Sequence, residues 1–233
     1  MAVTTFLAMT AAEIRENYKL PEHLGWMACH FSPYGLGLSN LPKKLPPDSL
    51  LILNDRIPIH GHDPEVILRQ LETLIAQEGC AGLLLDFQRP DYKETNSLAA
   101  HLCRGLGCPV AVSESYAKEL DCPVFLPPLP HHIPLKEYLS PWMDREVWLE
   151  LAMDAEIITL SEDGCQISSL PAWNVPDAGF EEDTLYCHYH MKIQEDWVEF
   201  TLWRTNDDLE YILKTAEKLG IKTAVGLFQE FRS

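Results

Sequence analysis

Three stretches of the chain repeat one hydrophobic pattern, in which an amphipathic helix ends at a glycine and an apolar strand follows. In the first stretch, Asp63 can cap a helix and Pro64 can open it, and apolar residues then recur at three- and four-residue spacing up to Gly79. The run from Gly82 to Phe87 is typical of a buried strand. This order predicts the helix-to-strand half of a βα unit.

Two later stretches show the same order. A helix with leucine at every fourth position precedes a predicted strand from Pro109 to Ser113. Near the end of the chain, Thr205 or Asn206 can cap a helix that stops at Gly220, and a strand from Thr223 to Phe228 follows. The pattern therefore indicates several βα units rather than an isolated one.

The predicted strands are continuous apolar runs, which is typical of parallel strands that are covered on both faces. Five further runs bring the number of predicted strands to eight: Trp26 to Phe31, Leu50 to Asn54, Pro123 to Leu126, Val147 to Ala152 and Leu185 to His190. Eight strands favour a closed barrel over an open sheet, and the chain has no GxGxxG turn for a dinucleotide fold. We expect an α/β fold, a compact (β/α)8 TIM-barrel-like domain that spans residues 1–233.

Two regions do not fit this repeat. The segment from Glu156 to Ser168 is typical of a hairpin that turns at Asp163-Gly164. The segment from Trp197 to Trp203 is predicted as an extra strand beside the run from Leu185 to His190. Short antiparallel additions are therefore expected late in the chain.

The charge of the chain excludes several partners. Its 35 acidic and 18 basic side chains give a net charge of −17, which repels nucleic acids and anionic membrane surfaces. The chain contains no apolar run of roughly 18 residues that would span a membrane, and no cationic segment precedes the short apolar run near the start. The seven cysteines show no CxxC pair and mostly lie in apolar runs, so we expect reduced, largely buried thiols in a cytoplasmic protein.

In a parallel barrel, functional side chains stand at the carboxyl ends of the strands. The polar residues predicted there are His30, Asn54, Asp55, Asp86, Gln88, Glu114, Glu150, His188, His190 and Gln229. Trp173, which lies in a loop between Pro171 and Pro176, could stack on a sugar ring or could anchor packing.

The segment from Ala81 to Gln88 resembles the DGxDxDxE strand of family 18 glycoside hydrolases. The resemblance lies in Gly82, in Asp86 as the last aspartate and in the aromatic residue that follows it. Arg89-Pro90 and the segment from Asp91 to Asn96 are similar to the continuation of that strand in the family. The segment from Val198 to Phe228 resembles the end of the family's barrel.

The chain departs from the family pattern at the residues that carry the chemistry. Ala81 and Leu84 stand where the family has aspartates, Phe228 stands where many members have tryptophan, and Gln88 stands where the family has its catalytic glutamate. In the family that glutamate protonates the departing sugar oxygen, and the preceding aspartate orients the N-acetyl group of the substrate as nucleophile. A glutamine cannot donate that proton, and general acid catalysis is typically worth about 10²–10⁴-fold in rate.

The resemblance therefore implies a hydrolase-like barrel with impaired catalysis, with Asp86 and Gln88 in the catalytic positions. The other polar residues at the strand ends would bind a carbohydrate or a similar small polar ligand. Residues two apart in a strand share a face, so Asp86 and Gln88 should point into the barrel mouth while Leu83, Leu85 and Phe87 face the helices.

Three alternatives stay open at this point. Glu114 could replace the missing acid in an active hydrolase, although it also suits a helix start or a salt bridge at the rim. The pairs His60/His62 and His188/His190 could hold a metal, but the other ligands of such a site are missing, so we expect neither a metal nor another cofactor. The chain could also be a scaffold whose barrel mouth is closed by its proline-rich loops. The oligomeric state does not follow from the sequence.

Overall fold

The computed structural model describes residues 2–17, 19–59, 61–89, 93–170, 175–176 and 179–231. The chain divides into two compact units. The barrel unit comprises Thr4–Pro127, Trp142–Glu150 and the chain from Thr223 onward, and the sheet unit comprises residues 2–3, Pro128–Pro141 and Leu151–Lys222. The expectation that residues 1–233 form a single domain stays a prediction.

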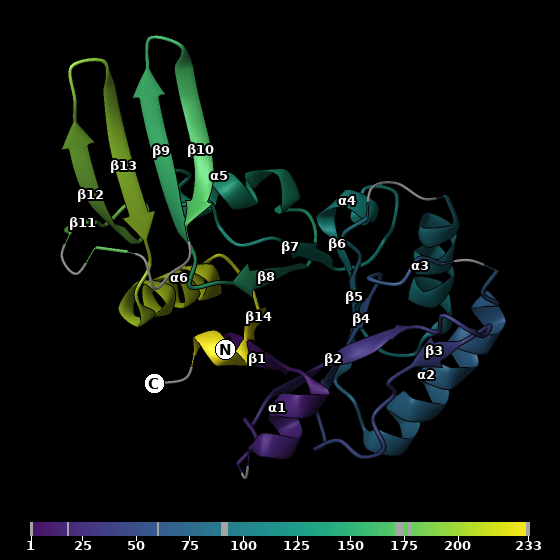
Figure 1. Ribbon diagram of the computed structural model, residues 1–233. Coiled ribbons are helices and arrows are strands. Elements are labelled where there is room, and N and C mark those ends of the chain that lie inside the picture. The colour runs from purple at the N-terminus through teal and green to yellow at the C-terminus, as the bar shows by residue number, and fades with distance from the viewer. Residues whose placement is uncertain are drawn as a thin grey trace. The chain divides into compact units, whose positions relative to one another are not determined.

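Eight strands close into a barrel (Figure 1). In order around the ring they are β1 (Thr4–Met9), β2 (Leu24–Phe31), β4 (Leu50–Asn54), β5 (Gly82–Asp86), β6 (Val110–Ser113), β7 (Val124–Leu126), β8 (Val147–Leu151) and β14 (Thr223–Leu227). The first strand, β1, pairs in parallel with both β14 and β2, and this closes the ring. The predicted TIM-barrel-like fold is confirmed. A short strand, β3 (Leu38–Ser39), pairs antiparallel with the end of β2.

Helices follow several strands of the barrel unit. They are α1 (Ala11–Glu16), α2 (Pro64–Glu78), α3 (Lys93–Gly105) and α4 (Glu114–Ala117), and the short helix η3 (Phe228–Glu230) follows β14. The boundaries of α2 are those predicted from the sequence. Asp63 caps its start by accepting a hydrogen bond from the backbone N–H of Glu65 at 2.9 Å. Gly79 ends it with a φ of +65°, a left-handed conformation that favours glycine.

Alternate strand positions fill the inside of the barrel. The buried residues of this core are Phe6, Ala8, Leu50, Ile52, Leu84, Ala111, Phe125, Trp148 and Val225. Leu83 and Leu85 are also buried, and as neighbours of Leu84 they lie on the other side of the strand, toward the helices. Gly82 must be small, because a Cβ there would lie 2.8 Å from the carbonyl oxygen of Pro109.

The structure corrects one of the eight predicted strands. The run from Leu185 to His190 does not belong to the barrel, because β12 (Cys187–Ile193) pairs antiparallel with β11 (Phe180–Glu182) and β13 (Trp197–Trp203) in a separate sheet. Its place in the ring is taken by β1, which sequence analysis treated only as a short apolar run near the start. The closing pairs of β1 join residues more than 200 positions apart in sequence, such as Thr4 and Thr223.

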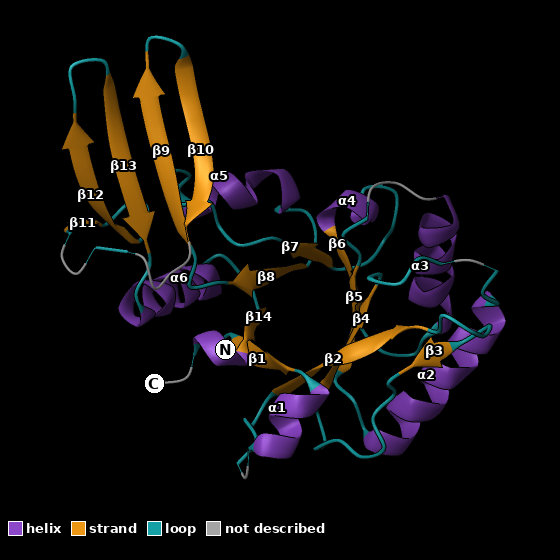
Figure 2. Ribbon diagram, in the orientation of Figure 1, coloured by secondary structure: helices purple, strands orange, loops and turns teal. Residues whose placement is uncertain are grey.

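The sheet unit contains a five-stranded antiparallel sheet (Figure 2). Its strands follow the order β10 (Gly164–Leu170), β9 (Ala155–Ser161), β13 (Trp197–Trp203), β12 (Cys187–Ile193) and β11 (Phe180–Glu182). The predicted hairpin is confirmed as β9 and β10, and β13 lies beside β12 as expected. The antiparallel additions thus form a sheet of their own. Among its described residues, this part of the chain forms the helices α5 (Leu135–Leu139), α6 (Asn206–Lys218) and η1 (Ser140–Trp142), whose last residue belongs to the barrel unit.

A buried arginine joins β13 to the loop before α5. Arg204 is only 4% exposed, and its guanidinium donates hydrogen bonds to the carbonyl oxygens of Leu129 at 2.5 Å, Pro130 at 3.2 Å and Tyr186 at 3.2 Å. Thr205 follows it and caps α6 in a capping box with Asp208, which confirms one of the two predicted caps. The arginine therefore connects segments that are about 75 residues apart in sequence.

Two histidines lie against the carboxylate of Glu156 on β9. His132 Nδ1 is 3.2 Å from Glu156 Oε2, and the fully buried His131 Nδ1 is 3.7 Å from the same oxygen. Burial by itself would raise the pKa of Glu156, but the hydrogen bonds and charges of these histidines lower that pKa to about 2, from an ordinary value of 4.5. The carboxylate is therefore held in its charged form in the folded protein.

Glu156 is expected to stabilise the protein above about pH 4.5 and to lose this contribution as the pH falls toward 2. A carboxyl whose pKa is lower in the folded state binds its proton first in the unfolded state, so acid favours unfolding. We expect Glu156→Gln to lower the free energy of unfolding at pH 6 by on the order of 2 kcal/mol, and the difference from wild type to shrink by pH 3. Urea unfolding at both pH values measures this. Glu162→Gln, which is exposed in the β9–β10 turn, controls for the lost charge, and an unchanged difference at pH 3 would contradict the assignment.

No helix in the described part of the chain is both long and apolar enough to cross a membrane. All seven cysteine thiols are free. Only Cys29 and Cys187 are fully buried, whereas Cys165 is exposed, so the thiols are less uniformly buried than the apolar runs predicted. Burial raises the pKa of Cys29 to about 12, which keeps this thiol protonated and unreactive.

Candidate functional site

A small cavity lies at the carboxyl ends of the barrel strands. It has a volume of about 70 Å³, and its polar lining consists of Asn54, Arg56, Asp86 and Glu150. Apolar side chains of the barrel core, among them Phe125, lie beneath these groups. The cavity therefore places two carboxylates and one guanidinium above an apolar floor.

Asp86 lies at the centre of this arrangement, at the end of β5. Burial raises the pKa of its carboxyl above the ordinary value, and the nearby Asp55 carboxylate adds to this rise. A hydrogen bond from Gln88 and the charge of Arg56 act in the opposite direction. The side-chain amide of Gln88 donates this bond from Nε2 to Asp86 Oδ1 at 2.5 Å. The predicted pair is thus in direct contact at the barrel mouth.

Gln88 is exposed and lines not the first cavity but a second one, of about 220 Å³, beside it. Ser113 and Glu114 from β6 and the start of α4 line this second cavity. Phe125 and Glu150 line both cavities, so the two are contiguous around these side chains. Glu150, which the sequence placed only among the ligand-binding residues, therefore lies near both Asp86 and Gln88.

Phe87 lies on the opposite side of the strand from Asp86, as alternation predicts. Its ring packs edge to face against Tyr116 of α4 at a centroid distance of 5.8 Å and lies 6.0 Å from Phe31. Its backbone N–H donates to Ser113 Oγ at 3.0 Å. These contacts hold the chain rigidly between Asp86 and Gln88.

Asp55 positions the backbone beside the site, and its expected role in binding a ligand stays a prediction. It is 3% exposed, and its carboxylate accepts hydrogen bonds from the backbone N–H groups of Gln88 at 3.0 Å and Arg89 at 2.9 Å. The side chain of Arg89 returns a bond from Nε to the carbonyl oxygen of Asp55 at 2.8 Å. This reciprocal clamp fixes the backbone on which Gln88 stands.

Asn54 lines the cavity and also holds the backbone of β2 in place. Its amide donates to the carbonyl oxygens of Met27 at 3.3 Å and Cys29 at 3.1 Å, where the register of β2 shifts at a bulge. His30, at the end of β2, is held by its neighbours: Nδ1 donates to the carbonyl oxygen of Phe31 at 2.8 Å and Nε2 accepts from Asn40 at 2.9 Å. Among the predicted ligand-binding residues, Asn54 is therefore better placed than His30.

The structure separates the two predicted histidines from the barrel strands. His188 and His190 lie on β12 in the antiparallel sheet, because that strand is not part of the barrel. His188 Nδ1 donates to Asp208 Oδ2 at 3.0 Å, and its ring stacks on Trp203. Neither His188 nor His190 therefore stands at the end of a barrel strand, as was expected, and their role in binding a ligand stays a prediction.

The remaining predicted residues lie at the end of the chain or outside the described residues. Gln229 is exposed in η3, just after β14. Trp173 and His60 fall outside the described residues. In the part of the chain that the structure describes, no group of three or more histidine, cysteine, aspartate or glutamate side chains is arranged to hold a metal ion.

Arg56 is a site residue that sequence reasoning missed. It follows Asp55 directly after β4, lines the barrel-mouth cavity, and its charge lowers the pKa of Asp86. Its backbone N–H donates to Asn54 Oδ1 at 3.2 Å, which orients the loop. Arg56 could have been identified from the sequence, because it is a basic residue directly after a strand end in an acidic chain.

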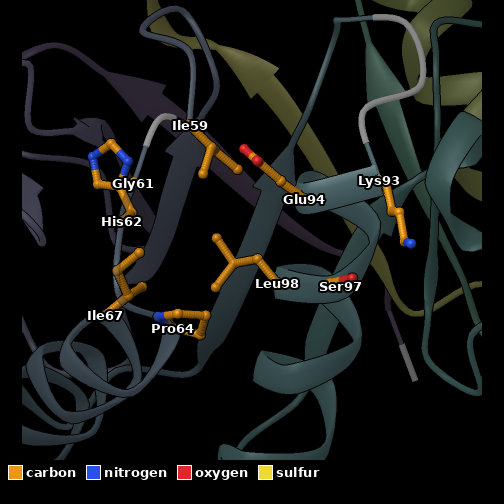
Figure 3. Close-up of a pocket in the computed structure, with 9 residues that line it drawn as sticks. All are labelled: Ile59, Gly61, His62, Pro64, Ile67, Lys93, Glu94, Ser97 and Leu98. Carbon is orange, nitrogen blue, oxygen red and sulfur yellow. The ribbon is translucent and has the colours of Figure 1, made fainter.

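A larger apolar cavity, of about 310 Å³, lies between α2 and α3 rather than at the barrel mouth. Figure 3 shows Pro64 and Leu98 at its wall, with the Glu94 carboxylate extending toward Ile59. The described residues that line it come from these helices and the loop before α2, and Asp86 is not among them. A catalytic or polar ligand-binding site needs side chains such as the carboxylates and the guanidinium of the barrel mouth, so we place the candidate site there.

Comparison with known proteins finds the same fold in several glycoside hydrolases. No family model matches the chain, and no curated protein sequence matches it significantly. Among solved structures, the spore cortex-lytic enzyme SleL of Bacillus cereus matches with a TM-score of 0.58 and 8% identity over 98% of this chain and 71% of that one. A chitinase from Chromobacterium violaceum matches with a TM-score of 0.63 and 8% identity over 100% and 96%.

A GH18 chitinase from Cycas revoluta, solved in complex with (GlcNAc)3, matches with a TM-score of 0.58 and 10% identity over 97% of this chain and 95% of that one. At sequence identities this low, the similarity shows a common fold alone. The chain thus has a barrel fold similar to that of these glycoside hydrolases.

Proposed function

We propose that this protein binds a carbohydrate at the mouth of its barrel and hydrolyses glycosidic bonds poorly or not at all. The observation that carries the proposal is the contact between Gln88 and Asp86 at the end of β5. It is supported by the fold, which matches chitinases, one of them solved with a bound N-acetylglucosamine oligosaccharide. The expected catalytic impairment follows from the chemistry of the side chain at position 88.

Gln88 can donate hydrogen bonds but cannot transfer a proton to a leaving oxygen. An efficient glycosidase of this kind needs a proton donor close to the carboxylate that orients the substrate. Here the amide of Gln88 points at Asp86, whose carboxyl is the group with a raised pKa. The pair is thus suited to hold an amide or hydroxyl of a sugar and lacks the family's acid at its usual place.

The dimensions of the site favour modest affinity. The two contiguous cavities, of about 70 Å³ and 220 Å³, are each smaller than the about 300–1,000 Å³ of typical ligand pockets. Asn54, Arg56 and Glu150 offer polar groups above the Phe125 ring, an arrangement that suits the polar edge and apolar face of a sugar. One sugar ring at the mouth, with its neighbours more exposed, fits these volumes better than a fully enclosed ligand.

Binding of an N-acetylglucosamine oligosaccharide is expected to depend on Asp86. We expect wild-type protein to bind (GlcNAc)4 and Asp86→Asn to bind at least about tenfold more weakly, since hydrogen bonds to charged groups contribute roughly 1.5–3 kcal/mol. Calorimetric titration measures both. Glu72→Gln, which removes one exposed charge from α2, is the matched control and should bind like wild type. A wild type that shows no heat and no chemical-shift change with the sugar would refute the proposal.

A second candidate function has a specific observation in its favour. Glu114 and Glu150 both line the cavity that Gln88 lines, so either could act as a displaced proton donor in an active hydrolase. Glu150 lines both cavities, whereas Glu114, at the start of α4, lines only the second, so Glu150 is at least as well placed. Turnover by wild-type protein separates this alternative from the impaired barrel.

A further inference from the structure

One face of the antiparallel sheet is apolar over its outer part. Side chains alternate between the two faces of a strand, so the register of the strands arranges the residues of one face in rows. One row contains Ile167, Ile158, Phe200 and Met191, and the next contains Cys165, Leu160, Val198 and Ile193. We call these two rows the apolar face.

The apolar face is open to solvent in the isolated chain. Ile193 is 66% exposed, Ile167 51%, Leu160 43% and Met191 42%. The apolar surface continues toward β11, where the ring of Phe180, itself largely exposed, lies 5.5 Å from that of Tyr189. Single exposed apolar residues are ordinary, but a contiguous patch across four strands marks an interaction surface.

The opposite face of the same sheet is mostly polar over its outer part. Its corresponding row contains Gln166, Thr159, Glu199 and Lys192, and Lys192 Nζ forms an ion pair with Glu199 Oε1 at 3.1 Å. The sheet is therefore amphipathic, with one side suited to water. The apolar face carries no ionisable group apart from the thiol of Cys165, although the chain has a net charge of −17.

We propose that the apolar face packs against the apolar face of a second copy of this chain, as a two-fold symmetric sandwich of two sheets. Sheets pack face to face about 10 Å apart with interdigitating side chains. A two-fold axis brings the same patch of both copies together, so the patch needs no other partner. Two copies of an acidic chain repel each other, and this face is where they meet without opposed carboxylates.

The size of the apolar face is consistent with a weak dimer. Strands lie about 4.8 Å apart and same-face residues about 7 Å apart, so two rows across four strands cover roughly 20 Å by 14 Å. This footprint of roughly 300 Å², extended by the exposed ring of Phe180, is smaller than the about 800 Å² per partner of a standard interface and is typical of a transient contact. We expect a dissociation constant in the micromolar range, because interfaces of this size reach that affinity without strong polar contacts.

Sedimentation velocity over about 1–100 µM tests the proposal, since this range spans the dissociation constants expected for such an interface. The wild type is expected to shift from monomer to dimer, and Ile167→Glu to stay monomeric, because each copy then buries a carboxylate in the apolar interface. Ile193→Glu, at an even more exposed position, provides a second variant with the same expected loss. Circular dichroism confirms that both variants fold.

The matched control is Gln166→Glu, which adds the same charge one residue away on the polar face of β10. It should dimerise like wild type. Wild-type protein that stays monomeric at 100 µM would overturn the proposal and leave the apolar face to a different partner. Dimerisation that persists in both Ile167→Glu and Ile193→Glu would overturn it as well, because the copies would then meet elsewhere.

Discussion

Replacing Gln88 by glutamate is expected to raise hydrolysis of an aryl N-acetylglucosaminide by about 10²-fold over wild type, whose turnover should lie near the uncatalysed rate. The substitution supplies the missing proton donor next to Asp86, and general acid catalysis is worth about 10²–10⁴-fold. The like charge of Asp86 raises the pKa of the new carboxyl, which suits an acid. We expect the lower end of the range, because Leu84 leaves Asp86 without the second aspartate of the family pattern.

The controls for this experiment use the same site. Asp86→Asn in the Gln88→Glu background should abolish the gain, whereas Gln166→Glu in the antiparallel sheet should leave the wild-type rate unchanged. Release of the aryl group, measured over pH 4–8, gives the rate of hydrolysis and its dependence on pH. Robust wild-type turnover that vanishes on Glu114→Gln or Glu150→Gln would replace the impaired barrel with a hydrolase that uses a displaced acid.

Arg204→Ala is expected to lower the free energy of unfolding by about 3–5 kcal/mol. The substitution leaves the carbonyl oxygens of Leu129, Pro130 and Tyr186 without their donor in a buried place. It also removes the cation that faces the carboxylates of Asp154, Glu156 and Asp208. In a chain of this size the melting temperature should fall by about 10 °C.

Thermal unfolding followed by circular dichroism measures this loss. Arg204→Lys keeps the positive charge, but the lysine ammonium lacks the planar guanidinium that reaches three carbonyl oxygens. An intermediate loss of stability is therefore expected. Arg15→Ala, which removes an exposed arginine of α1, should change the free energy of unfolding by no more than about 0.5 kcal/mol. An Arg204→Ala protein that melts within a degree or two of wild type would show that the buried guanidinium contributes little.

The sequence by itself determined the elements whose causes are local. Helix α2 begins after Asp63 and ends at Gly79, and α6 begins after Thr205, because caps and left-handed glycines act within one turn of the chain. The apolar strands and the hairpin at Asp163 followed from periodicity in the same way. The same-face relation of Asp86 and Gln88 was likewise accessible, since a strand repeats every two residues.

Other features depended on contacts between segments that are far apart in sequence. The barrel closes through β1, and no local pattern distinguishes that apolar run from the run at β12, because only the partners of each strand differ. The same reason moved His188 and His190 into the antiparallel sheet.

The roles of neighbouring polar residues were also decided by tertiary structure. Asp55 turns to the backbone of Gln88 whereas Arg56 enters the cavity, and Glu150 lies between the two cavities. Residue type and spacing identify which side chains can stand at a strand end. Which of them reaches the cavity depends on how the loops fold over it, and that is determined by packing between residues 30 or more positions apart, as in the clamp of Asp55 on Arg89.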